Sequence, residues 1–329
     1  MSALVDEYQA ALFDLDGVVY LGPAPVVGAP EGIQQLKDRG TQVGFVTNNA
    51  ARPPQVVVDQ LVGLGVPAEL SDVVTSAQAG ARMLADQLPA DSTVLVVGTE
   101  ALAAEVEAVG MRPVTSSADA PEAVIQGYDP QMTWPRLDDA CIAVQGGARW
   151  FATNTDSTRP TDKGLVPGAG AQIAAVGFTV RTTPQVAGKP YPPLLLETMR
   201  RMGTERAIFV GDRLDTDIMG AVAVGMDSLF VFTGAHGKRD LVEAGPDARP
   251  THIGFDLRAL LEPARTVERE GDVVRCGEQE ASLTDGTIRL AAVGEDQAGQ
   301  LDALWAVLQL AWEHPEADTA VVEQLSLLP

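Results

Sequence analysis

Two aspartates, Asp14 and Asp16, stand two residues apart at the end of a short apolar run in the stretch FDLDGVVYLG. An aspartate carboxylate attacks a phosphoryl group when a metal ion and a lysine withdraw charge from that group. A second acid two residues further along donates a proton to the departing alcohol and then takes one from water. The pair therefore predicts phosphoryl transfer, with Asp14 as the nucleophile and Asp16 as the general acid and base.

More polar clusters follow other apolar runs of the chain. They are Thr47, Asn48 and Asn49 in FVTNNA, Lys189 in AGKPY, and Asp212 and Asp217 in FVGDRLDTD. In doubly wound α/β folds ligands bind beyond the carboxyl ends of the strands, so we expect these clusters to converge. Converging carboxylates repel one another unless a hard cation lies among them, and oxygen ligands suit Mg²⁺. We therefore predict a magnesium site, with manganese and cobalt left open, beside a phosphate site that includes Asn49.

Each of these side chains has an expected role. The Thr47 hydroxyl and the groups around Asn48 donate to phosphate oxygens, and Lys189 offsets the charge of the nucleophile and the phosphate. Asp212 completes the ligands of the metal, while Asp217 orients Lys189 or a metal-bound water. Each cluster alone also has a structural interpretation as a turn, a helix cap or a surface lysine. Their occurrence together, each after an apolar run, favours the chemical interpretation.

The elements that position these residues are predicted from the apolar runs. Runs without polar alternation are typical of strands buried on both faces. They occupy residues 10–13, 43–47, 92–98, 207–211 and 228–234. Helices are expected between them, for example at 31–40 and at 191–203, where prolines stand at the start and a glycine at the end. Alternating strands and helices predict an α/β fold with a doubly wound parallel sheet.

Four stretches resemble the motifs of a known superfamily. FDLDGVVYLG, FVTNNA, GKP and FVGDRLDTDI are similar to the four motifs of the haloacid-dehalogenase superfamily, and in particular to subclass IIA, which includes 4-nitrophenyl, phosphoglycolate and pyridoxal phosphatases. The resemblance covers residues 8–262. It implies that Asp14, Asp16 and Asp212 bind magnesium, Asp16 through its backbone carbonyl, and that Asp14 is phosphorylated. Dehalogenases of the superfamily lack the second aspartate, so Asp16 indicates phosphoryl transfer.

The interval between Thr47 and Lys189 is far too long for a single crossover in a compact sheet. The resemblance implies that it holds the large α/β cap of subclass IIA. The predicted domains are a core of residues 1–81 and 184–262, an inserted cap of 82–183 and a C-terminal appendage of 263–329. A cap of this kind excludes water from the site and brings specificity residues to the leaving group.

The cap segment 150–171 resembles the part of the family fold that returns from cap to core, and it carries Arg159. In pyridoxal phosphatase the matching residue is a histidine, so this chain departs from the pattern for pyridoxal phosphate. The Arg159 guanidinium either holds a polar or anionic group of a small substrate or pairs with a surface acid. Asn154 and Asp156 are expected to fix the cap hinge.

The appendage differs in character from the rest of the chain. Residues 265–329 contain thirteen acidic residues against four arginines, a charge that opposes an anionic ligand such as acetyl-coenzyme A. Asp285-Gly286 between two strand-like runs predicts a hairpin, and 301–314 predicts an amphipathic helix. We interpret the segment as structural. One interpretation is a homodimer surface formed by Leu301, Leu304, Trp305, Leu308 and Trp312.

An acidic tail on an otherwise complete phosphatase resembles the actinobacterial glycerol-3-phosphate phosphatases. The resemblance implies glycerol 3-phosphate as substrate, with phosphoglycolate next and pyridoxal phosphate as a further alternative. Two other functions remain open. One is a phosphomutase that returns the phosphoryl group to a sugar, although the large cap argues against it. The other is a non-catalytic sugar-phosphate sensor, although a sensor has no need of a nucleophile beside an acid.

The composition excludes several classes of partner. The formal net charge of -22 leaves no basic surface for nucleic acid or for anionic lipids. No apolar stretch is long enough to span a bilayer, and the first ten residues lack the pattern of a secretory signal. The two cysteines, Cys141 and Cys276, stand far apart with no CxxC motif. These features predict a cytoplasmic protein that acts on a small molecule.

Overall fold

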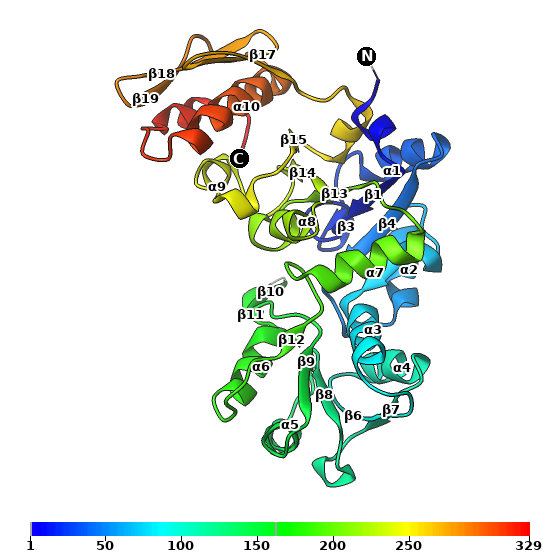
Figure 1. The fold of residues 1–329 in the computed structure, drawn as a ribbon. Coiled ribbons are helices and arrows are strands. Elements are labelled where there is room, and N and C mark those ends of the chain that lie inside the picture. Colours follow the sequence, from blue (N-terminus) through cyan, green and yellow to red (C-terminus); the bar gives the residue numbers. More distant parts are fainter. Residues whose placement is uncertain (1, 162) are drawn as a thin grey trace. The chain divides into compact units, whose positions relative to one another are not determined.

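The structure is a computed structural model that describes residues 2–161 and 163–329 (Figure 1). The chain forms two compact units. The first combines Met1–Val43 with Thr204–Pro329, and the second is Gly44–Gly203. No helix in the described part of the chain is long and apolar enough to cross a membrane.

The first unit contains a parallel sheet with the strand order β15-β14-β13-β1. Its strands are β1 (Ala10–Phe13), β13 (Ala207–Gly211), β14 (Asp227–Val231) and β15 (His252–Gly254). Every residue of β1 and β13 is buried, as their unbroken apolar sequences predict. Strand β4 (Gln42–Thr47) begins in this unit, where the Gln42 amide donates to the Gln9 carbonyl at 3.1 Å. The predicted α/β class is confirmed.

Helices and short turns connect these strands. They are α1 (Ala29–Asp38), α8 (Met219–Ala223), α9 (Lys238–Val242), the 3-10 turns η1 (Leu4–Glu7), η5 (Pro246–Ala248) and η6 (Leu257–Leu261), and the π-helical turn η4 (Leu214–Ile218); β2 (Tyr20–Leu21) and β3 (Ala24–Pro25) form a small hairpin. Helix α1, predicted at 31–40, has a proline in its first turn and buries Ile33 and Leu36. Its bounds differ from the prediction by two residues at each end.

The appendage belongs to the first unit and has its own antiparallel sheet. Its strands are β16 (Val267–Glu270), β17 (Val273–Cys276), β18 (Gln279–Thr284) and β19 (Thr287–Leu290), followed by α10 (Gln297–Glu313) and the 3-10 turn η7 (Ala320–Gln324). Both turn residues between β18 and β19 have positive φ, 51° at Asp285 and 73° at Gly286. This is the two-residue hairpin turn that an Asp-Gly pair favours, so the predicted hairpin is confirmed.

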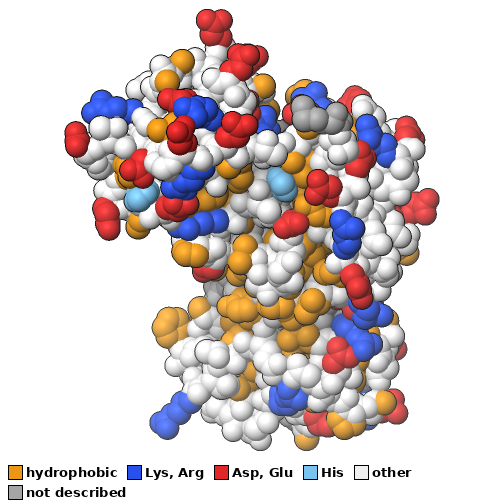
Figure 2. Space-filling model, turned by 45° about the horizontal axis from the view of Figure 1, so that its top comes forward, with side chains coloured by type: hydrophobic (Ala, Val, Ile, Leu, Met, Phe, Trp, Pro, Cys, Tyr) orange, Lys and Arg blue, Asp and Glu red, His pale blue; other side chains and the backbone are white. Residues whose placement is uncertain are grey.

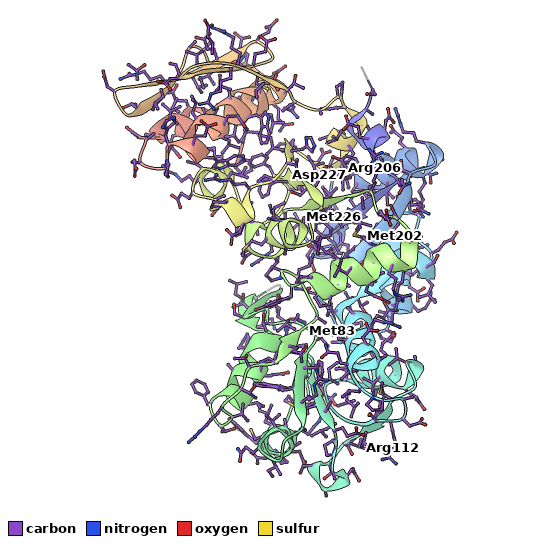
Figure 3. All side chains as sticks on the ribbon, viewed as in Figure 1. Met83, Arg112, Met202, Arg206, Met226 and Asp227 are labelled. Carbon is purple, nitrogen blue, oxygen red and sulfur yellow. The ribbon has the colours of Figure 1, made fainter. Side chains whose placement is uncertain are left out.

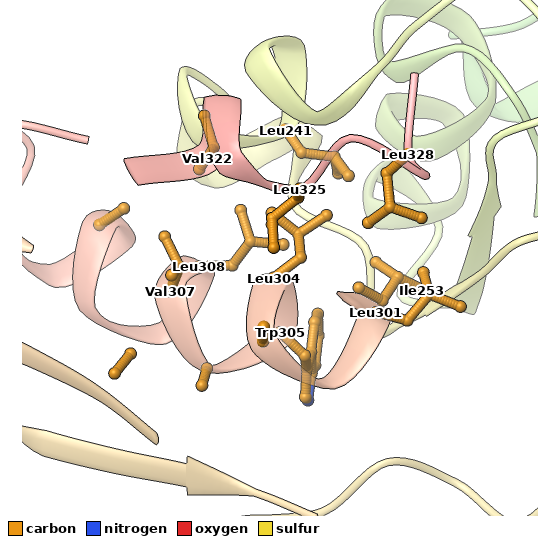
Figure 4. Close-up of a cluster of buried hydrophobic side chains, with 14 of the residues drawn as sticks. Leu241, Ile253, Leu301, Leu304, Trp305, Val307, Leu308, Val322, Leu325 and Leu328 are labelled. Atoms are coloured by element: carbon orange, nitrogen blue, oxygen red, sulfur yellow. The ribbon is translucent and has the colours of Figure 1, made fainter. Parts of the chain in front are cut away.

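The interpretation of the α10 side chains as a dimer surface is wrong. Their apolar face is covered by the core of the same chain, in a cluster that includes Phe230, Leu241 and Ile253 (Figure 4). The residues concerned are Leu301, Leu304, Trp305 and Leu308, which are buried, and Trp312, which is partly buried against the same cluster. Helix α10 also contacts β17, β18 and β19. Because it is covered on more than one face, it is apolar on more than one face.

Several of the acids of the appendage are engaged in ion pairs. Arg269 pairs with Glu313, and Arg275 pairs with Glu280 at 2.7 Å. On the face that Figure 2 shows, acidic and basic side chains are interspersed rather than gathered by sign. Ion pairs that are exposed in this way contribute little to stability, so the apolar cluster carries most of the attachment of the appendage.

The second unit contains two groups of parallel strands. Strand β4 pairs with β5 (Val73–Thr75), and a separate sheet has the order β12-β9-β8-β6-β7. The strands of that sheet are β6 (Thr93–Val97), β7 (Arg112–Val114), β8 (Ala123–Gln126), β9 (Arg149–Ala152) and β12 (Gln185–Val186). Apart from β12, the separate sheet falls within the predicted cap of 82–183. The cap boundaries themselves stay a prediction.

The helices of the second unit are α2 (Pro54–Gly63), α3 (Ser76–Gln87), α4 (Glu100–Ala108), α5 (Trp134–Gln145), α6 (Ala169–Gly177) and α7 (Pro192–Met202), with 3-10 turns η2 (Leu70–Asp72) and η3 (Ser117–Asp119). A hairpin joins β10 (Thr158–Thr161) to β11 (Gly164–Pro167). Helix α7 confirms the prediction for 191–203. It begins with two prolines and ends at Gly203, which has φ 63°.

Candidate active site

Three carboxylates lie together at the carboxyl ends of β1 and β13. One oxygen from each of Asp14, Asp212 and Asp217 lies within 4.8 Å of the other two. Asp14 directly follows β1, and its amide donates to the Val210 carbonyl at 2.9 Å, which aligns the two strand ends. Asp212 directly follows β13, and Asp217 lies in η4. The parallel pairing of β1 with β13 therefore brings together three of the acids that the sequence singled out.

Main-chain groups surround the Asp212 carboxylate. Asp212 is only 2% exposed, and its Oδ2 accepts a hydrogen bond from the Ala235 amide at 2.7 Å. A Cβ atom at Gly234 would lie 1.9 Å from that oxygen, and one at Gly17 would lie 2.5 Å from it. Gly17 also has φ 87°, which favours glycine. The backbone thus approaches Asp212 so closely that side chains are excluded at both glycine positions.

Asp217 is held in the same manner. It is fully buried, and its Oδ2 accepts the amides of Asp212 and Arg213, each at 3.2 Å. A Cβ atom at Gly211 would lie 2.3 Å from the Cβ of Asp217, so the last residue of β13 has to be glycine. Sequence reasoning gave Asp217 an orienting role, and the structure places it within the carboxylate group itself.

Asp16 is not one of the three grouped carboxylates. Its side chain is exposed, in the loop where the Gly17 amide donates to the Tyr20 carbonyl at 2.8 Å. The family resemblance implies that Asp16 binds metal through its backbone carbonyl, which requires no carboxylate oxygen in the group. Its role as general acid and base stays a prediction.

The side chain of Asn48 binds both sides of the Lys189 main chain in the second unit. Its Oδ1 accepts the Lys189 amide at 2.8 Å, and its Nδ2 donates to the Lys189 carbonyl at 3.0 Å. The Lys189 side chain is buried, with 2% exposure of the residue. Burial of a lysine is costly unless its charge is paired and hydrogen-bonded, so the place of its side chain matters. Asn48 therefore fixes the backbone that carries this lysine, a contact that sequence reasoning missed because it assigned Asn48 to phosphate.

Other residues secure the same junction. The Asn48 carbonyl accepts hydrogen bonds from Ser76 Oγ at 2.5 Å and from Asn154 Nδ2 at 2.7 Å, and Asn48 Nδ2 also donates to Asp156 at 3.1 Å. A Cβ atom at Gly188 would lie 2.6 Å from Asn48 Oδ1. Asn154 and Asp156 thus join the strand end of β4 to the segment before Lys189, while their predicted hinge role stays a prediction. Sequence reasoning missed Ser76 and Gly188, and only the glycine of GKP was a signal.

Thr47 and Asn49 form a tight turn directly after β4. The Asn49 amide donates to Thr47 Oγ1 at 3.1 Å, and the Ala51 amide donates to Asn49 Oδ1 at 2.9 Å. These are local side-chain to backbone bonds of the kind that Thr and Asn make in turns. The turn fixes the direction of the main chain at the positions predicted to bind phosphate.

Arg159 contacts an aromatic side chain of its own unit. Its Nε donates to the Tyr128 hydroxyl at 2.9 Å, and its guanidinium lies 5.0 Å from the centre of the Tyr128 ring. Arg159 is exposed on β10, so its charged group faces solvent beside an aromatic ring. Sequence reasoning offered a substrate group or a surface acid as its partner and missed Tyr128, for which spacing gave no signal.

The carboxylate group fits a small hard cation. All of its donors are oxygens, and three carboxylates so close together would repel one another without positive charge among them. The amides from Ala235, Asp212 and Arg213 orient two of the carboxylates but carry no full charge. Asp14, Asp212 and the carbonyl of Asp16 are therefore suitable to hold Mg²⁺, with Asp217 beside them.

Comparison with known proteins gives concordant matches. A family model for haloacid dehalogenase-like hydrolases matches residues 11–112, and a HAD-hydrolase-like model matches 186–260. A D-glycerol 3-phosphate phosphatase of Mycobacterium tuberculosis is 46% identical over 265 residues, which are 80% of this chain and 74% of the relative. A 5'-nucleotidase of Bacillus subtilis is 35% identical over 74% of this chain and 94% of its own length.

A solved structure is also similar. The crystal structure of a glycerol phosphate phosphatase from Mycobacterium tuberculosis in complex with magnesium aligns with a TM-score of 0.85 and 41% identity. The alignment covers 94% of this chain and 92% of that chain. A share of this size includes residues of the appendage.

Proposed function

The chain belongs to the haloacid dehalogenase-like hydrolases and is a phosphoric monoester hydrolase, and we propose that its substrate is glycerol 3-phosphate. The observation that carries the proposal is the 46% identity to a D-glycerol 3-phosphate phosphatase over most of the chain. The grouping of Asp14 with Asp212 and Asp217 at the strand ends supports the same chemistry. Magnesium is the cofactor, and the similar M. tuberculosis phosphatase was crystallised in complex with magnesium.

We propose the following roles for the residues of this chain. Asp14 attacks phosphorus through a carboxylate oxygen, and the bond from phosphorus to the alcohol oxygen breaks while Asp16 gives its proton to that oxygen. Asp16 then takes a proton from water, and the water oxygen attacks the phosphorus of the aspartyl phosphate. The bond from phosphorus to the Asp14 oxygen breaks, inorganic phosphate leaves, and the Asp14 carboxylate is restored. Bound Mg²⁺ supplies positive charge that offsets the charge on the phosphoryl group.

Lys189 and the turn after β4 complete the proposed site. Lys189 offsets negative charge on the phosphoryl group, and Asn48 fixes its main chain by the two hydrogen bonds described above. The Thr47 hydroxyl and the main-chain amide of Asn48 donate to phosphate oxygens, and Asn49 holds this turn through its amide bond to Thr47 Oγ1. Arg159 holds a polar group of the substrate. Its exposure on β10 supports this proposal.

The domain organisation is part of the proposal. Residues 1–81 and 184–262 form the core, 82–183 the cap and 263–329 the appendage. The separate sheet of β6, β7, β8 and β9 supports a cap of that extent, and the β16–β19 sheet with α10 supports the appendage. We also infer a cytoplasmic protein that does not bind nucleic acid, in keeping with its net charge of -22. A homodimer, if formed, uses a surface other than the buried face of α10.

The test is phosphate release in the presence of magnesium from a panel of phosphomonoesters. The panel holds both enantiomers of glycerol 3-phosphate, phosphoglycolate, pyridoxal phosphate, a nucleoside 5′-monophosphate and sugar phosphates. We expect the highest kcat/KM for one enantiomer of glycerol 3-phosphate, and higher turnover on another member would assign that substrate instead. Oxygen from isotope-labelled water should appear in the released phosphate, which a phosphomutase would not produce. Activity on none of the panel by a folded, magnesium-binding protein would favour a mutase or a sensor.

A further inference from the structure

The end of the appendage binds the short helix α9 through polar contacts. The Lys238 amide donates to the main-chain oxygen of Pro329 at 2.9 Å, and Lys238 Nζ donates to the Leu328 carbonyl. At the other end of α9, the Trp312 indole donates to the Leu241 carbonyl at 2.8 Å. Both ends of this helix are therefore bonded to residues of the appendage.

Apolar contacts reinforce these hydrogen bonds. Leu241 is fully buried, and it shares one cluster with Leu304, Leu325 and Leu328 (Figure 4). A five-residue helix is not stable by itself, because too few hydrogen bonds offset the entropy of its first turn. The position of α9 thus depends on the side chains that cover it, and several of these come from the appendage.

The segment directly before α9 contacts the carboxylate site. The Ala235 amide donates to Asp212 Oδ2 at 2.7 Å, and the His236 amide donates to the Asp212 carbonyl at 3.3 Å. His236 Nδ1 accepts the Leu214 amide at 2.9 Å, at the start of η4. Thr233 Oγ1 donates to the Gly17 carbonyl at 2.5 Å. The segment 233–237 therefore touches both loops that carry the predicted metal ligands.

We propose that the end of the appendage, residues 325–329, positions Asp212 for metal binding by holding α9 and, through it, the segment 233–237. The inference rests on the proposed function only in taking Asp212 as a metal ligand. The contacts form a continuous path from Pro329 through Lys238 and Ala235 to the Asp212 carboxylate, and all of it lies within the first unit.

Release of the tail would act on Asp212 through this path. Without the tail, α9 loses two hydrogen bonds and part of its apolar cover, and the segment before it gains freedom. The Ala235 amide then no longer holds the Asp212 carboxylate at one angle. Partners of a metal ligand typically change metal affinity by about 10- to 100-fold when they are lost, and an indirect partner belongs at the low end.

Two variants disturb the contact in different ways. Deletion of residues 326–329 removes the main-chain acceptors of Lys238 but keeps the buried Leu325. Gly237→Ala keeps the whole tail but places a Cβ atom 2.8 Å from the main-chain oxygen of Pro329, so the tail has to move. Lys238→Ala removes the side-chain donor, and Lys238→Arg restores one. Arg275→Gln is the matched control, because it removes an exposed ion pair of the appendage far along the chain from the tail.

The measurement is the dissociation constant of Mg²⁺ from the free enzyme, by titration calorimetry, together with kcat and KM at saturating Mg²⁺. We expect the deletion and Gly237→Ala to raise the dissociation constant about tenfold, with kcat at saturating Mg²⁺ within about twofold of wild type. Lys238→Ala should raise it less and Lys238→Arg should return it towards wild type. Arg275→Gln should leave it unchanged.

An unchanged dissociation constant in the folded deletion variant would overturn the inference. If the deletion does not fold, Gly237→Ala and Lys238→Ala decide the question, and unchanged Mg²⁺ binding in both would overturn it. Circular dichroism and unfolding without Mg²⁺ establish which variants are folded. Because calorimetry needs no turnover, a failure of the proposed substrate leaves this test intact, and a failure of this test leaves the proposed substrate intact.

Discussion

The two edges of the parallel sheet in the first unit both carry acidic side chains, but they are built differently. At the carboxyl ends of the strands, Asp14, Asp212 and Asp217 bring three carboxylates together. At the amino ends, Asp227 is hydrogen-bonded to a side chain that precedes the neighbouring part of the sheet. The Tyr8 hydroxyl donates to Asp227 at 2.9 Å, and the ring Nε2 of His252 lies 3.5 Å from the same hydroxyl oxygen. Figure 3 marks Asp227 and Arg206 at this edge.

The carboxyl edge of the sheet serves ligand binding, and the amino edge serves the stability of the fold. Three close carboxylates repel one another, and the backbone is drawn tightly around them by glycines, so this edge is arranged for a ligand that is positively charged. In the Tyr8–Asp227–His252 group the Tyr8 hydroxyl donates to the Asp227 carboxylate, a bond that stabilises the fold. Changes at the carboxyl edge should therefore cost activity, and changes at the amino edge should cost stability.

The largest expected effect is that of Asp14→Asn. Loss of the nucleophile should lower kcat at least about 1000-fold, in the range seen when a nucleophile is removed from an enzyme. The unfolding free energy without Mg²⁺ should not fall, since one of three repelling charges is gone. The matched control is Asp227→Asn at the opposite edge, which should retain kcat. Phosphate release and urea unfolding check both statements. Full activity of Asp14→Asn would refute the assignment of catalysis to the carboxyl edge.

Asn48→Ala should lower both activity and stability. Asn48 lies at the carboxyl end of a strand, and its side chain binds the main chain of Lys189. Its removal leaves two buried groups of Lys189 without their partners, which costs about 1–3 kcal/mol in unfolding free energy. Displacement of Lys189 should lower kcat about 100-fold. Asn48→Asp keeps the acceptor for the Lys189 amide but places a carboxylate oxygen against the Lys189 carbonyl and Asp156, so it should not recover the lost stability. Equal stability of Asn48→Ala and wild type in urea would show that the two bonds are dispensable.

Gly234→Ala tests the close approach of the backbone to Asp212. The added Cβ would lie 1.9 Å from Asp212 Oδ2, so the carboxylate or the loop has to move. We expect Mg²⁺ affinity to fall about tenfold, as it does when a partner of a metal ligand is lost. Gly63→Ala is the control, because nothing lies within 4 Å of its Cβ position. Titration calorimetry measures both, and a dissociation constant equal in the two variants would refute the expectation.

The sequence predicted the elements of this fold better than the contacts between them. Strands β1 and β13 have the predicted bounds of 10–13 and 207–211, because each is an apolar run that ends at a polar residue or a glycine motif. Parallel strands that are buried on both faces place their carboxyl ends together, so the grouping of Asp14 with Asp212 follows from the pattern.

Contacts over long sequence separations could not be predicted in this way. The bonds from Asn48 to the Lys189 main chain and from Arg159 to Tyr128 depend on how separate loops meet, and an amide or a tyrosine in a loop carries no spacing signal. The apolar residues of α10 were assigned to a dimer surface because the pattern shows that a face is covered, but not which part of the chain covers it.

Tyr8→Phe tests the stabilising role of the amino edge. The variant keeps the ring and removes the hydroxyl that donates to Asp227 at 2.9 Å. Burial raises the pKa of Tyr8, and the hydrogen bond to the Asp227 carboxylate raises it further. The hydroxyl therefore stays a donor at neutral pH. We expect a loss of about 1 kcal/mol in unfolding free energy and no change in kcat. A change in kcat with intact stability would contradict the division between the two edges.

The smallest expected effect concerns the pH dependence of stability at the amino edge. Burial lowers the pKa of His252 below its ordinary value of 6.5, while Asp227 and Glu7 oppose that shift. Below pH 6.5 the unfolded chain therefore takes up a proton that the folded chain resists. The contribution of His252 to stability is present above pH 6.5 and is lost as the pH falls toward the folded pKa. One such proton changes the unfolding free energy by at most about 1.4 kcal/mol per pH unit.

In His252→Gln the decline of the unfolding free energy between pH 7 and pH 5 should be shallower than in wild type, as measured by urea unfolding. The slope should be unchanged by Asn49→Ala, which alters no titrating group. A steeper decline in His252→Gln would mean that His252 binds a proton more readily in the folded chain than in the unfolded chain. The amino edge would then favour a positive charge as the carboxyl edge does.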